Sequence, residues 1–127
     1  MADKIQIIEA IRAASLQKDH ETFLSHLTDD VEYHYHMGSR PLMGKAWVQK
    51  FLTKYDAITK NVVWRIERFA EVGDCLLLEG YEEYTDMRTN EKIAHPYMSA
   101  IEFNGEKVAK WRDYFEMNNK KRTTNDE

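Results

Sequence analysis

The N-terminal part of the chain carries apolar side chains at the spacing of α-helices. From Ile5 onward such residues recur every three or four positions, and Asp3 followed by Gln6 matches a capping box in front of them. Asp19 stands at the start of a second, shorter stretch of this kind. A third helix is predicted for residues 45–55, where the large apolar residues share one face: Trp47, Val48, Phe51, Leu52 and Tyr55. We therefore expect three helices.

Elsewhere, apolar and polar residues alternate, which is typical of β-strands. One strand is predicted before the third helix and four after it, at residues 31–37, 62–72, 75–86, 92–103 and 106–117. Turns are predicted at 73–74 and 104–105, where glycine follows or precedes a turn-forming polar residue, and at 87–91. The stretch 40–44 is also interpreted as a turn. The last four strands then form a meander of hairpins.

This order of elements indicates the α+β class, with helices packed on one face of a curved antiparallel sheet. The strands are longer than the usual strand of about five or six residues. Long strands that curve around helices leave a cavity at the open end, and such cavities are common ligand sites. Residues 1–117 are expected to form a single domain, and the polar residues 118–127 a disordered tail.

Composition narrows the class of partner. The chain has 127 residues, of which 43% are hydrophobic, and this is enough for one domain with a core. A net charge of -4, from 18 basic and 22 acidic residues, argues against nucleic acid as the main partner. No apolar run resembles a signal peptide or a membrane span, and Cys75 is the only cysteine. We expect a cytoplasmic protein with no intrachain disulfide and no membrane partner.

Strand alternation places two carboxylates on the inner face of the predicted sheet. Asp113 shares a face with Trp111 and Phe115, and Glu82 shares a face with Tyr84. The other side chains predicted to line the same interior are Tyr33, Tyr35, Trp64, His95, Tyr97 and Ser99. Two inward carboxylates among tyrosine hydroxyls are typical of sites that perform acid/base chemistry.

Simpler interpretations of both carboxylates stay open. Asp113 is also compatible with a buried structural acid that is held by tyrosine hydroxyls or backbone N–H groups. A β-bulge near Gly80 would turn Glu82 outward to solvent. An inward Glu82 close to Asp113 favours an enzyme, whereas an outward one favours a module without catalysis.

Other residues that attract attention have structural interpretations. His34 and His36 share a strand face, but that face is opposite the tyrosines, and no third ligand has a suitable spacing. We expect no metal site, and a subunit contact is the alternative role for this pair. Trp47 and Phe51 are interpreted as helix core, and Cys75 as a small core residue.

The element order and the stretch "GEKVAKWRDYFEM" at 105–117 together resemble a known fold family. The stretch is similar to the pattern Gly-Lys-Ile-x-x-Trp-Arg-Asp-Tyr-Phe-Asp of nuclear transport factor two-like proteins, in their SnoaL-like and limonene epoxide hydrolase-like branch. The resemblance implies a cystatin-like fold, a cone-shaped curved antiparallel sheet on three N-terminal helices. In limonene epoxide hydrolase an Asp-Arg-Asp set, a tyrosine and an asparagine position the attacking water. The matching positions here are Asp113, Gly80, Glu82, Tyr33 and Tyr35.

Ketosteroid isomerase shares this architecture, but its reaction is not expected here. Its general base would fall near Tyr33 and its oxyanion carboxylic acid near Ser99, and neither residue supplies that chemistry.

The resemblance and the inner residues together imply a cofactor-independent acid/base enzyme, a hydrolase, cyclase or isomerase, that acts on a small, largely apolar molecule. Asp113 would orient or deprotonate water or substrate, Glu82 would donate a proton, and His95 would relay it. Because Gly80 replaces the family arginine, a non-catalytic ligand-binding or dimerisation module is the alternative. We also expect a homodimer through the outer face of the sheet, which carries Leu77, Tyr81, Val108 and Tyr114.

Overall fold

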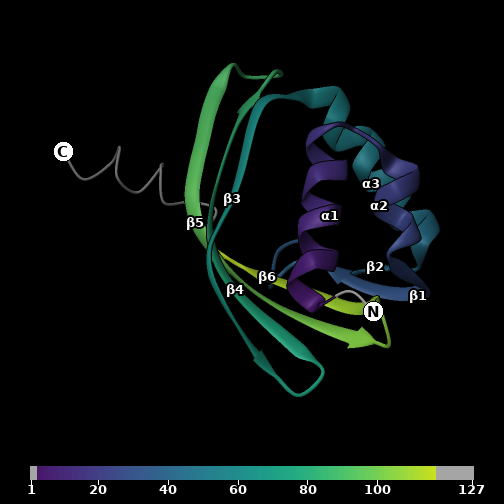
Figure 1. Ribbon diagram of the computed structural model, residues 1–127. Helices are drawn as coiled ribbons and strands as arrows, with labels where there is room; N and C mark the ends of the chain where they lie inside the picture. The colour runs from purple at the N-terminus through teal and green to yellow at the C-terminus, as the bar shows by residue number, and fades with distance from the viewer. Residues whose placement is uncertain (1–2, 117–127) are drawn as a thin grey trace.

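Three helices lie on the concave side of a strongly curved sheet in the computed structural model, which describes residues 3–116 (Figure 1). They are α1 (Lys4–Leu16), α2 (His20–Ser25) and α3 (Lys45–Ile58). The predicted caps are confirmed at the first two. The backbone N–H of Asp3 donates to Gln6 Oε1 at 2.9 Å, and that of Thr22 donates to Asp19 Oδ1 at 3.1 Å.

Six strands form one sheet within these residues, in the order β2-β1-β6-β5-β4-β3. They are β1 (Leu27–His34), β2 (Leu42–Met43), β3 (Thr59–Val72), β4 (Cys75–Asp86), β5 (Glu91–Asn104) and β6 (Lys107–Tyr114). The pairs are antiparallel except for β1 and β6, which run parallel. The short β2 lies where a turn was predicted, because Leu42 and Met43 pair with the edge of β1.

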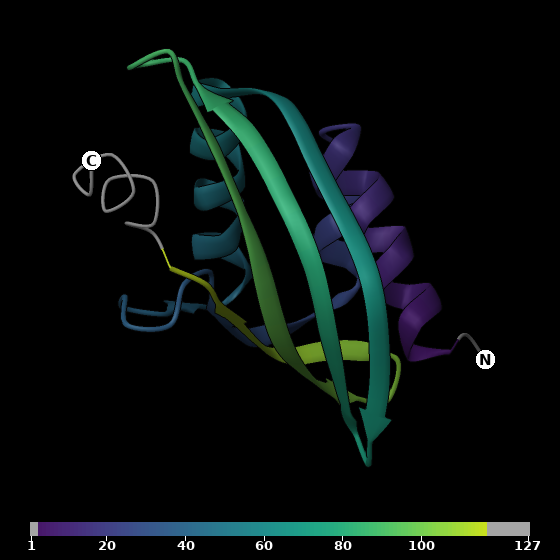
Figure 2. The same cartoon turned by 90° about the vertical axis from the view of Figure 1, so that its left-hand side faces the viewer.

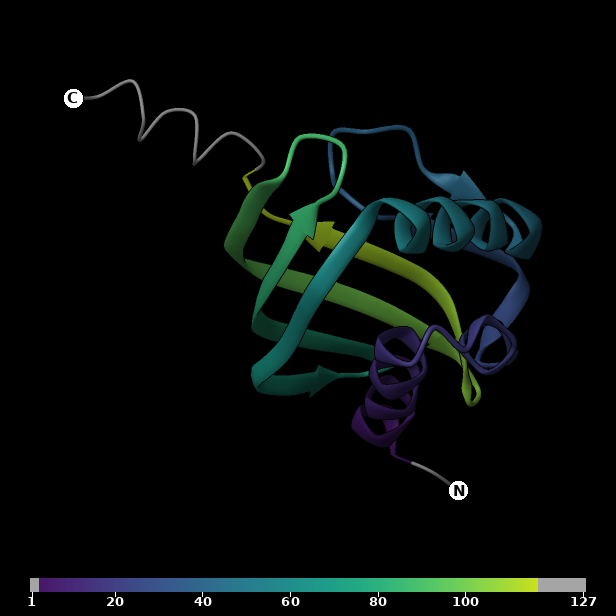
Figure 3. The ribbon, with the colours of Figure 1, turned by 90° about the horizontal axis from the view of Figure 1, so that it is seen from above.

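The four-strand meander is confirmed, and its first three strands bend together along their length (Figure 2). The turn after β3 contains Gly73 at φ +59°, and the turn after β5 contains Gly105 at φ +63°, a region in which glycine has no steric penalty. Register shifts interrupt β3 in two places along β4. Bulges of this kind increase the bend of a strand. Viewed from above, β3 lies toward the left and α1 and α3 toward the right, and β5 and β6 cross the view between them (Figure 3).

One end of the space between the sheet and the helices is filled by a dry core. Three isoleucines of α1 pack there against apolar side chains of β4, β5 and β6. Its buried members include Ile7, Ile8, Ile11, Leu76, Leu78, Ile101 and Val108. No helix within residues 3–116 is long and apolar enough to cross a membrane.

Two predictions of burial are wrong. Val108 was expected on the outer face but is 0% exposed, because a register shift between Glu102 and Phe103 reverses the alternation at that end of β6. Trp47 was expected in the core but is 55% exposed, and Lys50 Nζ lies 4.4 Å from the centre of its ring. The predicted tail at 118–127 lies outside the described residues.

Candidate functional site

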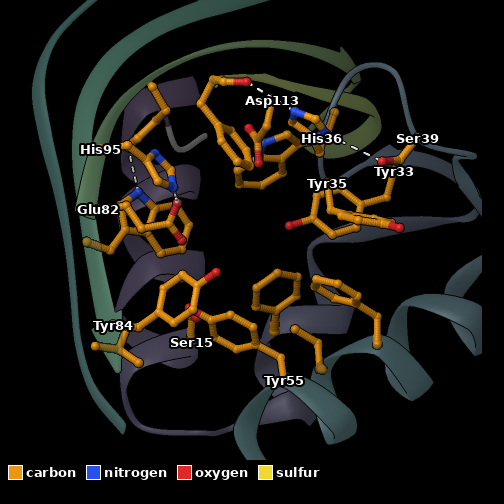
Figure 4. A pocket seen from close by; sticks show the side chains of 18 residues that line it. Ser15, Tyr33, Tyr35, His36, Ser39, Tyr55, Glu82, Tyr84, His95 and Asp113 are labelled. Carbon is orange, nitrogen blue, oxygen red and sulfur yellow. Dashed lines mark hydrogen bonds and ion pairs between the residues drawn. The ribbon is translucent and has the colours of Figure 1, made fainter. Parts of the chain in front are cut away.

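A cavity of about 470 Å³ occupies the other end of the space between the helices and the sheet. Most of its lining is aromatic: Phe23, Tyr33, Tyr35, Phe51, Tyr55, Trp64, Tyr84, Tyr97, Trp111 and Phe115. Its polar lining consists of Ser15, His36, Ser39, Glu82, His95 and Asp113, and Leu52 and Val62 complete it. Figure 4 shows Asp113 and Glu82 on adjacent sides of the open centre, with Tyr35 and Tyr55 on the other sides.

Asp113 is held firmly by two hydrogen-bond donors. Ser99 Oγ donates to its Oδ1 at 2.5 Å, and Trp111 Nε1 donates to the same oxygen at 2.7 Å. Trp111 reaches it because residues two apart on a strand share a face. Burial raises the pKa of Asp113 to about 7, although both hydrogen bonds act in the opposite direction. The carboxyl is therefore fixed in place, while its ionisation remains energetically unfavourable.

Glu82 is held much less firmly. In the register of β3, β4 and β5 it lies between Trp64 and His95. Among contacts within residues 3–116, its carboxyl has one polar neighbour, His95 Nε2 at 3.7 Å from Oε1. Burial, and then the charge of Asp113, raise the pKa of Glu82 to about 7. A proton on Glu82 is thus available to a ligand rather than engaged by the protein.

His95 is oriented toward Glu82 by its other contacts. Its ring stacks on Phe115, with centroids 4.3 Å apart and planes 7° apart. Nδ1 lies 3.1 Å from the carbonyl oxygen of Pro96, to which it can donate, and this leaves Nε2 as the acceptor that faces Glu82. Burial lowers the pKa of His95, so the neutral ring is favoured.

Ring contacts connect the aromatic wall. Tyr33 meets Trp111 edge-on at 5.7 Å and Phe51 at 5.9 Å, and Phe51 stacks on Tyr35 at 4.9 Å. Tyr55 meets Tyr84 edge-on at 5.5 Å. Burial raises the pKa of Tyr33 well above its ordinary value, so its hydroxyl stays protonated and can donate to a ligand.

Gly80, where the resemblance to limonene epoxide hydrolase implies an arginine, has no room for a side chain. A Cβ atom on Gly80 would lie 2.2 Å from the carbonyl oxygen of Arg65 and 2.4 Å from Tyr97 Oη. The Tyr97 hydroxyl is fixed there because it donates to that same carbonyl at 3.0 Å and accepts from Trp64 Nε1 at 2.7 Å. Tyr97 therefore covers Gly80, and no cationic side chain can extend from this position.

The structure brings together all but one of the residues predicted for the site. Tyr33, Tyr35, Trp64, Glu82, Tyr84, His95, Tyr97, Trp111, Asp113 and Phe115 line the cavity. Ser99 is not part of the lining; it is 2% exposed and lies behind Asp113, to which it donates. The predicted inward orientation of Glu82 is confirmed.

Sequence reasoning missed the other eight lining residues: Ser15, Phe23, His36, Ser39, Phe51, Leu52, Tyr55 and Val62. His36 was placed on the outer face, but β1 ends at His34, and the alternation ends with it. His36 Nε2 lies 3.1 Å from the carbonyl oxygen of Phe115, and Nδ1 lies 3.4 Å from Ser39 Oγ. Gly38 was the available signal for this turn. Phe51 and Tyr55 lie one helical turn apart on α3 and were recognised as an apolar face but not as a cavity wall.

The histidine pair is divided by the end of β1. His34 Nε2 lies 2.5 Å from Glu32 Oε2, whereas His36 faces the cavity. Within residues 3–116, no group of three or more His, Cys, Asp or Glu side chains is arranged to hold a metal ion.

Comparison with known proteins identifies the family. The family model of the SnoaL-like domain matches residues 8–111. No curated protein matches the chain. Among solved structures, a nuclear transport factor two-like protein of unknown function from Burkholderia pseudomallei has a TM-score of 0.83 at 17% identity, over 96% of this chain and 97% of that one.

Two further solved structures show the same fold. A protein with a ketosteroid isomerase-like fold from Catenulispora acidiphila, in complex with trimethylamine, has a TM-score of 0.81 at 18% identity, over 91% of this chain and 89% of that one. An LEH-like epoxide hydrolase from M. tuberculosis has a TM-score of 0.78 at 21% identity, over 89% and 82% of the two chains. With the family model spanning most of its length, this chain belongs to the SnoaL-like domain family.

Proposed function

We propose that this protein is an acid/base enzyme that needs no metal or organic cofactor and acts on a small, largely apolar molecule in the aromatic cavity. The observation that carries the proposal is the unequal support of two carboxyl groups in one cavity. Asp113 is fixed by two donors, whereas Glu82 has only His95 at 3.7 Å. Pairs of titratable groups with different environments are how enzymes assign acid and base roles.

Asp113 suits the role of base or orienting group. Both of its donors bind Oδ1, and no hydrogen bond from another described residue reaches Oδ2. That oxygen can accept a proton or a hydrogen bond from water or substrate in the cavity. A pKa near 7 places the group where proton transfer at neutral pH is efficient.

Glu82 suits the role of proton donor. Its raised pKa leaves much of it protonated at neutral pH, and His95 Nε2 faces it as an acceptor that can pass the proton onward. Tyr33 and Tyr35 line the cavity and would hydrogen-bond a substrate oxygen or a water. The arrangement suits hydrolysis, cyclisation or isomerisation, each of which needs one proton removed and one supplied.

The structural likeness to an LEH-like epoxide hydrolase is compatible with this proposal but supports only the fold at 21% identity. One observation favours the alternative, a non-catalytic ligand-binding module. Tyr97 fills the place where the arginine of the epoxide hydrolase set would connect the two carboxylates. Without that cation the family mechanism lacks one of its parts.

A turnover screen distinguishes enzyme from module. Small apolar epoxides, enones and β-keto esters would be incubated with the native protein, and products followed by mass spectrometry. Glu82→Gln and Asp113→Asn should each reduce conversion by about 100-fold. Glu83→Gln is the matched control, because the next residue of β4 faces away from the cavity and accepts from the Tyr81 hydroxyl. Conversion that survives both cavity variants, or tight binding of these compounds with no conversion of any, contradicts the enzyme.

A further inference from the structure

The charge of the cavity is unbalanced. Its lining contains two carboxyl groups, Asp113 and Glu82, and among the described lining residues there is no lysine or arginine. The groups that face these carboxyls are Tyr33 of β1, Tyr55 of α3, Tyr84 of β4, His95 and Tyr97 of β5, and His36 after β1. None of these carries a permanent positive charge.

Nearby arginines are directed elsewhere. Arg12 donates from Nε to Glu9 and from Nη1 to the carbonyl oxygen of Trp64 at 2.7 Å. Arg112, the neighbour of Asp113 in sequence, donates to Glu102 at 2.6 Å. Position 80 has no room for a cationic side chain either, because Tyr97 occupies the space above Gly80. Within residues 3–116 the protein thus provides no fixed cation for its two carboxyls.

The rest of the cavity wall suits a cation with apolar substituents. Figure 4 shows the rings of Tyr35, Tyr55 and Tyr84 around the open centre, across from or beside the carboxyls. Trp64 and Trp111 also line the cavity, with ring centroids 6.1 Å apart. Aromatic faces attract ammonium groups through the ring quadrupole, and most strongly where water is excluded.

We propose that the cavity selects a small organic cation, an amine or quaternary ammonium with apolar substituents, and that its positive charge lies between Asp113 and Glu82. The ligand supplies the positive charge that an arginine at position 80 would otherwise provide. This inference rests on the proposed role of the same cavity as a ligand site and names the chemical class of the ligand.

The proposal predicts that binding depends on pH. A cation favours the ionised carboxyls, so its affinity should rise as pH increases through about 7, where both groups titrate. The four facing tyrosines have raised pKa values and stay neutral over this range, and burial lowers the pKa of His95. The contribution of His36 is separated by repeating the titration with His36→Gln.

Phenyltrimethylammonium and its carbon isostere tert-butylbenzene test the proposal directly, because they have the same shape and differ in charge. Binding would be followed by tryptophan fluorescence in a Trp47→Phe background, which removes the exposed indole and leaves the two in the cavity as reporters. At pH 8 the cation should bind at least about tenfold more tightly than the isostere, and at pH 5 this preference should fall below about threefold.

Variants of the two carboxyls test whether they produce the preference for the cation. Glu82→Gln and Asp113→Asn should each weaken binding of the cation by about fivefold or more at pH 8 while leaving the isostere unchanged. Glu83→Gln should change neither. Equal affinities at pH 8, or a preference that does not change with pH, would overturn the inference, as would a failure of both compounds to bind at millimolar concentration. The acid/base proposal is decided separately by the turnover screen, since a cavity that prefers the neutral isostere can still be catalytic.

Discussion

The two ends of the space under the sheet are built from the same strands but have opposite properties. On β4, Leu76 and Leu78 belong to the dry core, whereas Glu82 and Tyr84, further along the same face, line the cavity. At the core end the isoleucines of α1 fill the concave side. At the cavity end the helices leave about 470 Å³ open. Stability is therefore expected to come from one end, and the other end can hold groups whose charge is costly.

Gly80 and Tyr97 lie between the two ends. They pair in the register of β4 and β5, and the Tyr97 ring covers the glycine. An aromatic ring over a strand glycine compensates for the side chain that the glycine lacks. Here the same contact also removes the position from which a cation could reach the carboxyls.

The largest difference is expected between leucine-to-alanine variants at the two ends, in how much each reduces the free energy of unfolding. Leu78 is 1% exposed within the core, so Leu78→Ala should reduce the free energy of unfolding by about 4 kcal/mol. Leu52 is 6% exposed but borders the cavity, so Leu52→Ala removes fewer packing contacts and should cost about 2 kcal/mol. Urea unfolding of both variants measures the difference. Equal losses would show that the cavity end is as tightly packed as the core.

The boundary between the ends should tolerate no added atom. Gly80→Ala places a methyl group against the backbone oxygen of Arg65, and we expect a loss of about 3 kcal/mol by urea unfolding. The double variant Gly80→Ala/Tyr97→Phe should not recover stability, because the backbone clash remains. Recovery would show that the Tyr97 hydroxyl alone limits the space.

Neutralising a carboxyl at the cavity end should stabilise the fold. The folded-state pKa of Asp113 is raised from 3.8 to about 7, so ionisation disfavours the folded state, and stability falls as pH increases between these values. Asp113→Asn keeps an acceptor for Ser99 and Trp111 but cannot ionise. It should raise the free energy of unfolding by about 2 kcal/mol at pH 8 and have little effect at pH 3.

Glu83→Gln provides the control for this measurement, because Glu83 belongs to the same sheet but faces away from the cavity. Its unfolding free energy should change little at either pH. A destabilised Asp113→Asn at pH 8 would mean that the carboxylate is stabilised by contacts stronger than its burial.

The smallest effect on the fold is expected on the outer face of the sheet. Leu77, Met98 and Tyr114 are exposed there, and we propose that a second copy of the chain covers them. Met98→Lys should leave the unfolding free energy of the monomer within about 0.5 kcal/mol but convert dimer to monomer in sedimentation experiments. A native protein that sediments as a monomer would contradict the dimer.

The sequence was sufficient where alternation or helical spacing ran without interruption. The three helices, the meander, and the inward orientation of Glu82 and Asp113 all followed from it. It failed where a strand ended or shifted register: His36 lies past the end of β1, and Val108 lies beyond the register shift of β6 opposite Glu102 and Phe103. Side-chain parity depends on each residue in between, so one bulge reverses every assignment beyond it.

The position of Ser99 could not be found from parity alone. Its face was predicted correctly, but the hydroxyl is consumed by Asp113 and is not open to a ligand. The lack of space for a side chain at Gly80 also could not be predicted from the sequence, because it depends on the rotamer of Tyr97 and on the distance to the neighbouring strand. Alternation gives the face of a residue but not the distances among side chains on that face.

The central claim is that Asp113 and Glu82 share one low-dielectric cavity and titrate as a coupled pair. Carboxyl carbon NMR of the native protein and of Asp113→Asn measures this directly. In the native protein the two carboxyls should lose their protons in two steps, both at pKa values well above the ordinary ones. In Asp113→Asn the pKa of Glu82 should fall but stay raised, because burial is the larger cause and Asp113 the smaller one. Titration of both groups near about 4 in the native protein would contradict the account.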